Sequence, residues 1–185
     1  MPHAHPPATV AAAIALPVAL AAGIITAAVI TQRHQNPDSG VATGPVAVGA
    51  VPAPAASSPP CNALLAALPD PLGDATKAAL AAPAPDGAAA WHSPTVGEPL
   101  VLRCGIERPA EFTAAAALVV VNGVQWLQIS GDPTGLNAST WVAVDRSVYV
   151  AITLPDGTGS APLQDAADAV TKALPPQPLN PAPVR

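Results

Sequence analysis

An uncharged apolar stretch from Ala8 to Ile30 constrains this chain more than any other feature. It covers about 23 residues, against the roughly 20 that an α-helix needs to cross a bilayer core. It contains no Asp, Glu, Lys or Arg, and Pro17 lies near its middle, where a membrane helix tolerates a bend. We therefore expect this segment to tether the chain to a membrane.

Two other interpretations of the stretch fit less well. A cleaved signal peptide has a basic start and an apolar core of about 7–15 residues. Here residues 1–7 carry no Lys or Arg, and the apolar core is longer. A lipoprotein is disfavoured because Ser58-Pro59-Pro60 before Cys61 is not the small-residue pattern that lipidation requires. We expect an uncleaved signal anchor, preceded by a short tail of residues 1–7.

The orientation of this anchor rests on two opposing signals. Arg33 follows the apolar stretch, and the positive-inside rule taken alone would place the rest of the chain in the cytoplasm. The chain has only two cysteines, Cys61 and Cys104, and a structural pair is typical of oxidising compartments. We give the cysteines more weight than a single arginine and expect the C-terminal domain outside the cytoplasm, in the cell envelope.

Composition divides the remainder of the chain into three parts. Residues 31–60 are rich in Pro and Ala and lack hydrophobic periodicity, which favours a disordered or extended linker. Residues 61–175 have the length of one small domain with a single core. Residues 176–185 form a Pro-rich C-terminal tail.

Helical spacing appears at both ends of the domain. Near its start, apolar residues follow Cys61 at the i, i+3, i+4 and i+7 positions of one helix face, and near its end a second such run stops at Pro175. Asp74 is placed to cap a short helix through Ala82, before a loop at residues 83–87. The two apolar runs are Leu64, Leu65 and Leu68, and Leu163, Ala166, Ala167, Val170 and Leu174.

Strand patterns lie between these helices. A short apolar run covers residues 100–104, and Asn122-Gly123 separates two β-rich runs, which is a strong hairpin signal. A second hairpin is expected over residues 141–154, turning around Asp145-Arg146-Ser147. In its second strand Val148, Val150, Ile152 and Leu154 alternate with Tyr149, Ala151 and Thr153, so one face is buried. We predict an α+β domain: a small antiparallel sheet, two hairpins plus a short strand, packed by N- and C-terminal helices.

The two cysteines admit two interpretations. A Cys61–Cys104 disulfide would join the first helix to the first strand and stabilise the fold by about 4 kcal/mol in the chain-entropy model. Alternatively, Cys104 is a free thiol activated by His92, the only histidine after residue 34. We prefer the disulfide because the anchor places the domain in an oxidising compartment.

The pattern also resembles a known family. It combines Cys61, Trp91-x-x-Pro94, Leu102-Arg103-Cys104-Gly105, Asn122-Gly123-Val124-x-Trp126 and Arg146-x-Val148-Tyr149-Val150. This combination resembles actinobacterial membrane-anchored or secreted proteins that are classed only as a domain of unknown function. The resemblance implies an N-terminal span with the domain outside, and it implies no activity. His92 departs from the small residue expected after the tryptophan, which argues against a shared catalytic histidine.

A few polar and aromatic side chains are candidates for a binding surface. Trp126, Trp141 and Tyr149 lie in the two hairpins, where they either stack on a ligand or belong to the core. Arg103 and Arg108 flank the Cys104 turn and would suit an anionic ligand, unless they are simply solvated surface charges.

The overall charge limits the partners. The chain has 7 basic and 12 acidic residues, a net charge of −5, which argues against nucleic-acid binding. We expect no cofactor and no metal, since His92 lacks the further ligands that a metal needs. The sequence favours a non-enzymatic envelope module that is anchored in the membrane through Ala8 to Ile30. It would either bind an envelope protein or a cell-wall component, or act as a structural assembly factor for a membrane complex, and the sequence does not separate these two roles. The alternative is an extracytoplasmic thiol-dependent enzyme that uses Cys104 and His92.

Overall fold

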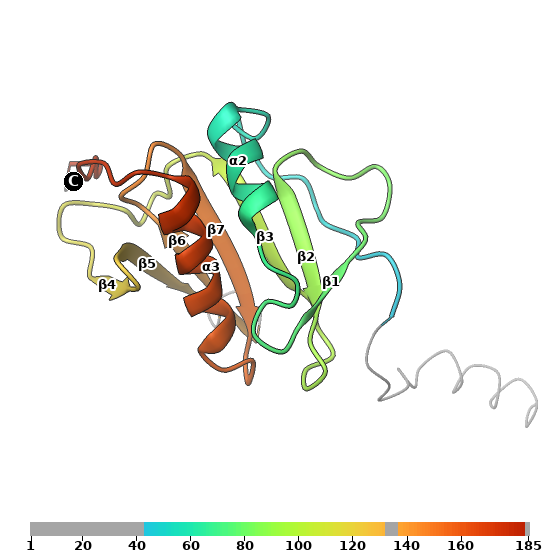
Figure 1. Cartoon of the computed structure of the whole chain (residues 1–185). Coiled ribbons are helices and arrows are strands. Elements are labelled where there is room, and N and C mark those ends of the chain that lie inside the picture. Colours follow the sequence, from blue (N-terminus) through green and yellow to red (C-terminus); the bar gives the residue numbers. More distant parts are fainter. Residues whose placement is uncertain (1–42, 132–136, 184–185) are drawn as a thin grey trace, which may run out of the picture. The chain divides into compact units, whose positions relative to one another are not determined.

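The computed structural model describes residues 43–131 and 137–183. Within these ranges, a seven-stranded antiparallel sheet carries two helices on one of its faces (Figure 1). In chain order the elements are α2 (Pro59–Ala67), β1 (Thr76–Ala78), β2 (Ala88–His92), β3 (Leu100–Ile106), β4 (Leu118–Val121), β5 (Val124–Ser130), β6 (Ala138–Ala143), β7 (Tyr149–Pro155) and α3 (Ala161–Ala173).

The sheet consists of two meanders that meet at its centre. Its strand order is β1-β2-β3-β7-β6-β5-β4, and every neighbouring pair is antiparallel. The first meander runs from β1 to β3, and the second returns from β4 to β7, which pairs with β3. The predicted α+β class with an antiparallel sheet, packed helices and one disulfide is confirmed.

Both predicted hairpins are present. Asn122 and Gly123 connect β4 to β5 with φ values of 46° and 77°, the positive values that a two-residue hairpin turn of this type requires. The second hairpin turns at residues 144–148 between β6 and β7. The alternation along β7 is as expected: Val150, Ile152 and Leu154 enter the main core, whereas Ala151 packs on the opposite face.

The segment between α2 and β3 differs from the prediction. The short helix expected from Asp74 to Ala82 is wrong, because residues 76–78 form β1, and β2 at residues 88–92 was not anticipated. Alanine favours a helix when only local preferences count. Here Lys77 lies opposite Trp91, and Trp91 lies opposite Leu100, so sheet pairing and burial of Trp91 override that preference.

The main core lies between the sheet and the two helices. Its largest fully buried side chains include Trp91, Trp126, Leu64, Leu100 and Ile152. A smaller cluster covers part of the other, helix-free face, where Phe112 from the segment between β3 and β4 packs against the sheet. Its buried members are Phe112, Leu127, Val142, Val144 and Ala151.

The two segments that flank the predicted domain pack against it. Val46 bridges to Leu80 and is 5% exposed, and Ala55 N–H donates to the carbonyl oxygen of Gly105 at 3.1 Å. We call residues 43–56 the N-terminal strap and residues 175–183 the C-terminal strap. The fold therefore starts before the expected linker ends at residue 60, and it extends into the expected tail.

The predicted anchor, Ala8 to Ile30, lies outside the described residues. Of the residues that the structure describes, none form a helix that is both long and apolar enough to cross a membrane.

Candidate functional site

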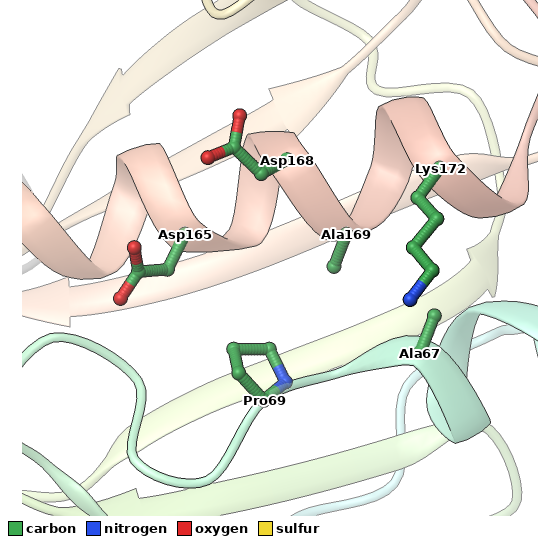
Figure 2. A pocket seen from close by; sticks show the side chains of 6 residues that line it. All are labelled: Ala67, Pro69, Asp165, Asp168, Ala169 and Lys172. Atoms are coloured by element: carbon green, nitrogen blue, oxygen red, sulfur yellow. The ribbon is translucent and has the colours of Figure 1, made fainter.

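One hollow lies on the helix-covered side of the sheet, between the end of α2 and the outer face of α3 (Figure 2). It has a volume of about 290 Å³, and Lys172 points across it toward Ala67. The two carboxylates that line it both accept hydrogen bonds from other segments of the domain. Asp165 Oδ2 accepts from the backbone N–H of Gly73 at 2.6 Å, and Asp168 Oδ1 accepts from Asn122 Nδ2 at 2.8 Å. These contacts favour a structural role for this hollow.

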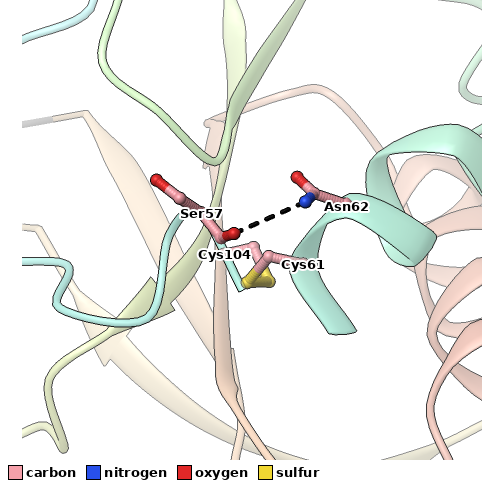
Figure 3. The surroundings of a disulfide bond; sticks show 4 residues. All are labelled: Ser57, Cys61, Asn62 and Cys104. Atoms are coloured by element: carbon pink, nitrogen blue, oxygen red, sulfur yellow. Dashed lines mark hydrogen bonds between the residues drawn. A yellow bond between two sulfur atoms is a disulfide. The ribbon is translucent and has the colours of Figure 1, made fainter. Parts of the chain in front are cut away.

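The disulfide joins the start of α2 to the centre of β3 (Figure 3). Cys61 and Cys104 are bonded, with their Cα atoms 5.5 Å apart and neither residue exposed. Beside it, Asn62 Nδ2 donates to the carbonyl oxygen of Ser57 at 3.4 Å. Because the chain has no third cysteine, this arrangement leaves no thiol for nucleophilic chemistry.

His92 does not face Cys104. Cys104 belongs to the main core on the helix side, whereas His92 lies at the end of β2, on the face that carries Arg103. Its Nε2 donates to the carbonyl oxygen of Gly44 at 2.8 Å, so it holds the N-terminal strap. Across residues 43–131 and 137–183, no three His, Cys, Asp or Glu side chains gather in a metal-binding group.

The helix-free face carries a second hollow, in the form of a groove. It has a volume of about 310 Å³ and lies between the N-terminal strap and the central strands β3, β7 and β6. Its floor includes Thr140 and Thr153, whose hydroxyl oxygens are 2.9 Å apart in a hydrogen bond. We call it the Arg103 groove. Its lining residues are Val51, Pro52, Arg103, Ile106, Glu107, Thr140, Ala151 and Thr153.

Arg103 is the distinctive side chain of this groove. It is half-buried, and its Nη2 donates to the carbonyl oxygen of Gly49 in the strap at 3.4 Å. Its Nε is buried without a hydrogen-bond partner, and it forms no ion pair with a carboxylate of the described chain. Desolvation by burial lowers the pKa of the Arg103 guanidinium. A partly desolvated cation without a counter-ion is suited to bind an anionic group.

The local backbone holds the strap beside this arginine. Gly105 follows Cys104 at an irregularity in the β3–β7 register and has a φ of 78°. A Cβ atom at this position would collide with the backbone of Ala55. The Leu-Arg-Cys-Gly motif therefore places the arginine, the disulfide and the strap contact on successive residues of one strand.

The aromatic candidates divide between the two faces. Trp126 is fully buried in the main core, so it does not contribute to a surface. Trp141 is half-buried and packs against the same core on the helix side. Tyr149 is half-buried on the helix-free face, where its ring meets Phe112 edge-on with centroids 6.2 Å apart.

Arg108 lies outside the groove. It is exposed, and its Nη1 donates to the carbonyl oxygen of Asn180 in the C-terminal strap at 3.3 Å. The hydroxyl of Tyr149 donates to the same carbonyl oxygen at 3.5 Å. Of the five candidate surface residues, only Arg103 lines the groove.

Sequence reasoning missed most of the groove. Val51 and Pro52 belong to a segment that has the composition of a linker, and nothing local indicates that it packs on a sheet. Thr140 and Thr153 lie opposite each other in β6 and β7. The period-two alternation assigned Thr153 to its face, but it did not include Thr140, which precedes the predicted hairpin, and it does not indicate which segment covers that face.

Several motif residues meet at a buried polar junction at one end of the sheet. Arg146 Nη1 and Asp145 Oδ2 form an ion pair at 2.8 Å, with side chains that are 1% and 5% exposed. Asp145 Oδ2 also accepts from the backbone N–H of Gln125 at 3.1 Å, and Thr171 Oγ1 donates to the carbonyl oxygen of Asn122 at 3.1 Å. This junction connects both hairpin turns to α3, which is a structural role.

These features define a disulfide-linked α+β domain with the Arg103 groove on its helix-free face. The chain belongs to the family described as a protein of unknown function (DUF3515), whose match spans residues 14–179. The match includes most of the apolar stretch as well as the domain. No curated protein and no solved structure matches the chain.

Proposed function

We propose that this protein is a non-enzymatic binding module of the cell envelope, tethered by Ala8 to Ile30 with its domain outside the membrane. The Arg103 groove binds a carboxylate of an envelope protein or a cell-wall component. The observation that carries the ligand chemistry is the half-buried Arg103, which has no carboxylate partner in the described chain.

Two features support the extracytoplasmic placement. Both cysteines are consumed in one buried disulfide, and such bonds persist mainly in oxidising compartments. The uncharged stretch before the domain has the length of a membrane span. The high alanine and proline content further suits an actinobacterial source.

The shape and chemistry of the groove support a small carboxylate. A planar guanidinium binds a carboxylate through two parallel hydrogen bonds, and partial burial strengthens these bonds. Val51, Pro52 and Ile106 supply apolar walls for the remainder of the ligand. Glu107 at the same groove suits a ligand that also carries an amino group, as peptides do.

A matched pair of probes tests this chemistry. The purified full chain in a mild detergent is titrated with acetyl-Ala-Ala bearing a free carboxylate, and separately with its C-terminal amide. Binding is followed by the shift of the Arg103 side-chain Nε–H signal in NMR. We expect saturable binding of the acid and none of the amide. Equal binding of both probes, or no saturable binding, contradicts the proposal.

Two arginine variants locate the site. Arg103→Lys keeps the charge but loses the planar fork, so we expect the dissociation constant for the acid to rise about tenfold. Arg108→Lys is the matched control, because Arg108 is exposed and lies outside the groove, and we expect it to bind as the wild type does. An equal rise of the dissociation constant in both variants would show that the acid binds through non-specific electrostatic attraction.

A separate experiment tests on which side of the membrane the domain lies. Glu98 is exposed in the loop before β3, so Glu98→Cys adds one accessible thiol without touching the groove. A membrane-impermeant maleimide applied to intact cells should label this variant and leave the wild type unlabelled. Labelling that appears only after the cells are broken places the domain in the cytoplasm.

A further inference from the structure

The edge strand β4 exposes apolar side chains on both faces of the sheet. Val119 is 44% exposed and lies opposite Trp126, so it stands on the helix-covered face. Val120 is 68% exposed and lies opposite Gln125, which places it on the helix-free face. The run Leu118 to Val121 contains no charge and no proline. Such an edge is a template for pairing with another strand.

The free backbone groups of β4 can be assigned from its partner strand. Gln125 directs both of its backbone groups away from β4, since its N–H donates to Asp145 Oδ2 and its carbonyl oxygen accepts from the N–H of Val144. Antiparallel pairs alternate between bonded and non-bonded positions. Val120, opposite Gln125, therefore points its N–H and C=O outward, and so does Leu118 two residues earlier.

The opposite edge of the sheet, at β1, is protected from pairing with another strand, unlike the edge at β4. At β1 the backbone N–H of Lys77 donates to Asp70 Oδ1 at 3.0 Å, and Lys77 itself carries a charge. Immediately after β1, the N-terminal strap continues the pairing, as Val46 exchanges backbone hydrogen bonds with Ala79 and Ala81 at 2.8 Å. Within the described residues, β4 has no such cover.

We propose that a second copy of this chain pairs with β4 across a two-fold axis, giving one continuous antiparallel sheet. A two-fold axis through Leu118 or through Val120 would pair only one of these two outward residues within β4, whereas an axis through Val119 pairs both, so we propose the register centred on Val119. Leu118 pairs with Val120 of the second copy and exchanges both hydrogen bonds, and the symmetric pair does the same. Val119 then faces its own counterpart on the axis.

This register explains why the exposed valines occur on both faces. The two Val119 side chains cover each other on the helix side, and Val120 is covered by Leu118 on the helix-free side. The absence of charge matters because a two-fold axis would bring identical charges together, which is destabilising in opposite strand positions. A heterologous partner strand would not require this self-complementarity.

Engineered cysteines test the register in the purified full chain. Val119→Cys places two thiols on the axis with Cα atoms about 4.5 Å apart, within the range of about 4.4–6.8 Å for a disulfide. Val120→Cys is the matched control, because its counterparts are diagonal neighbours about 7–8 Å apart. With copper phenanthroline as oxidant, we expect Val119→Cys to run at twice the monomer mass on a non-reducing gel and Val120→Cys to stay monomeric.

A charge variant tests the association without a cross-link. Light scattering of the wild type in detergent should give a protein mass of two chains, and Val119→Lys should give one. Thr76→Lys, at an exposed site in the opposite edge strand, is the control and should remain dimeric. An intact Cys61–Cys104 bond in each variant, shown by mass after alkylation, verifies folding.

Several outcomes would overturn the proposal. A wild type of one-chain mass at every soluble concentration excludes the dimer. Equal cross-linking of both cysteine variants shows random collision, and a Val119→Lys variant that stays dimeric shows association through another segment. If Val119→Cys instead cross-links to a different protein in cell membranes, β4 serves a heterologous partner.

Discussion

Arg146 donates from Nη2 to the carbonyl oxygen of Gly123 at 3.1 Å, so the turn between β6 and β7 holds the turn between β4 and β5. The same guanidinium donates from Nη1 to the carbonyl oxygen of Asp145 and pairs with its carboxylate. Two consecutive hairpins are thereby joined through their turns at one end of the sheet.

Loss of this arginine is expected to destabilise the fold strongly. Arg146→Ala leaves the Asp145 carboxylate buried without its partner, and we expect the free energy of unfolding to fall by about 3–5 kcal/mol. Unfolding in guanidinium chloride, followed by circular dichroism, measures this change in free energy. Arg108→Ala, at an exposed site, should change the value by less than about 0.5 kcal/mol. Similar losses in the two variants would show that the junction does not stabilise the fold.

Two glycines with similar backbone angles should respond differently to alanine. Gly123 has a φ of 77° with no atom within 4 Å of an added Cβ, so Gly123→Ala should lose about 1–2 kcal/mol from the left-handed backbone alone. Gly105→Ala has the same strain and also collides with Ala55, which forces the strap to move. We expect a clearly larger loss for Gly105→Ala in denaturant unfolding. Equal losses of unfolding free energy in the two variants would mean that the strap moves away from the added Cβ at no energetic cost.

The two fully buried tryptophans offer another matched pair. Trp91 Nε1 donates to the carbonyl oxygen of Pro69 at 3.3 Å, whereas Trp126 Nε1 is buried without a partner. Both Trp→Phe changes remove similar volume, but only Trp91→Phe also leaves an acceptor unpaired. We expect Trp91→Phe to be more destabilising by about 1–3 kcal/mol, measured by thermal or denaturant unfolding. The reverse order would contradict this account.

The disulfide has a direct chemical test. Alkylation of the native protein should add no label, and alkylation after reduction and unfolding should add one to each cysteine, as read by intact mass. Replacing both cysteines with serine should lower stability by about 4 kcal/mol in the chain-entropy model. Labels on both cysteines before reduction would disprove the bond and reopen thiol chemistry at Cys104.

Local signals predicted the elements whose patterns are strong. The Asn122-Gly123 turn, the alternation along β7 and the helical spacing before Pro175 each depend on residues that are close in sequence. Weak patterns led to wrong secondary-structure predictions. The alanine-rich residues 74–92 have no clear period, and their strands exist because β3 and Trp91 provide a partner and a core.

The candidate site was harder to predict than the fold. Arg103 was identified beside Cys104, but the same reasoning placed Arg108 and Trp126 with it, and these lie outside the groove or in the core. Charge and aromaticity are properties of single residues. Whether a side chain reaches solvent depends on which segment covers it, and here the strap at residues 49–52 forms one wall.

The sequence by itself determined the α+β class, the hairpin turns and the cysteine pair, because turn chemistry and side-chain periodicity act over a few residues. Only the tertiary structure decided the two extra strands, the packing of both straps and the position of Arg103 away from every carboxylate of the described residues. These depend on contacts between residues such as Gly49 and Arg103, or Ala55 and Gly105, that are some fifty positions apart. Pairing over such separations is selected by burial and backbone hydrogen bonding, for which the local sequence carries no signal.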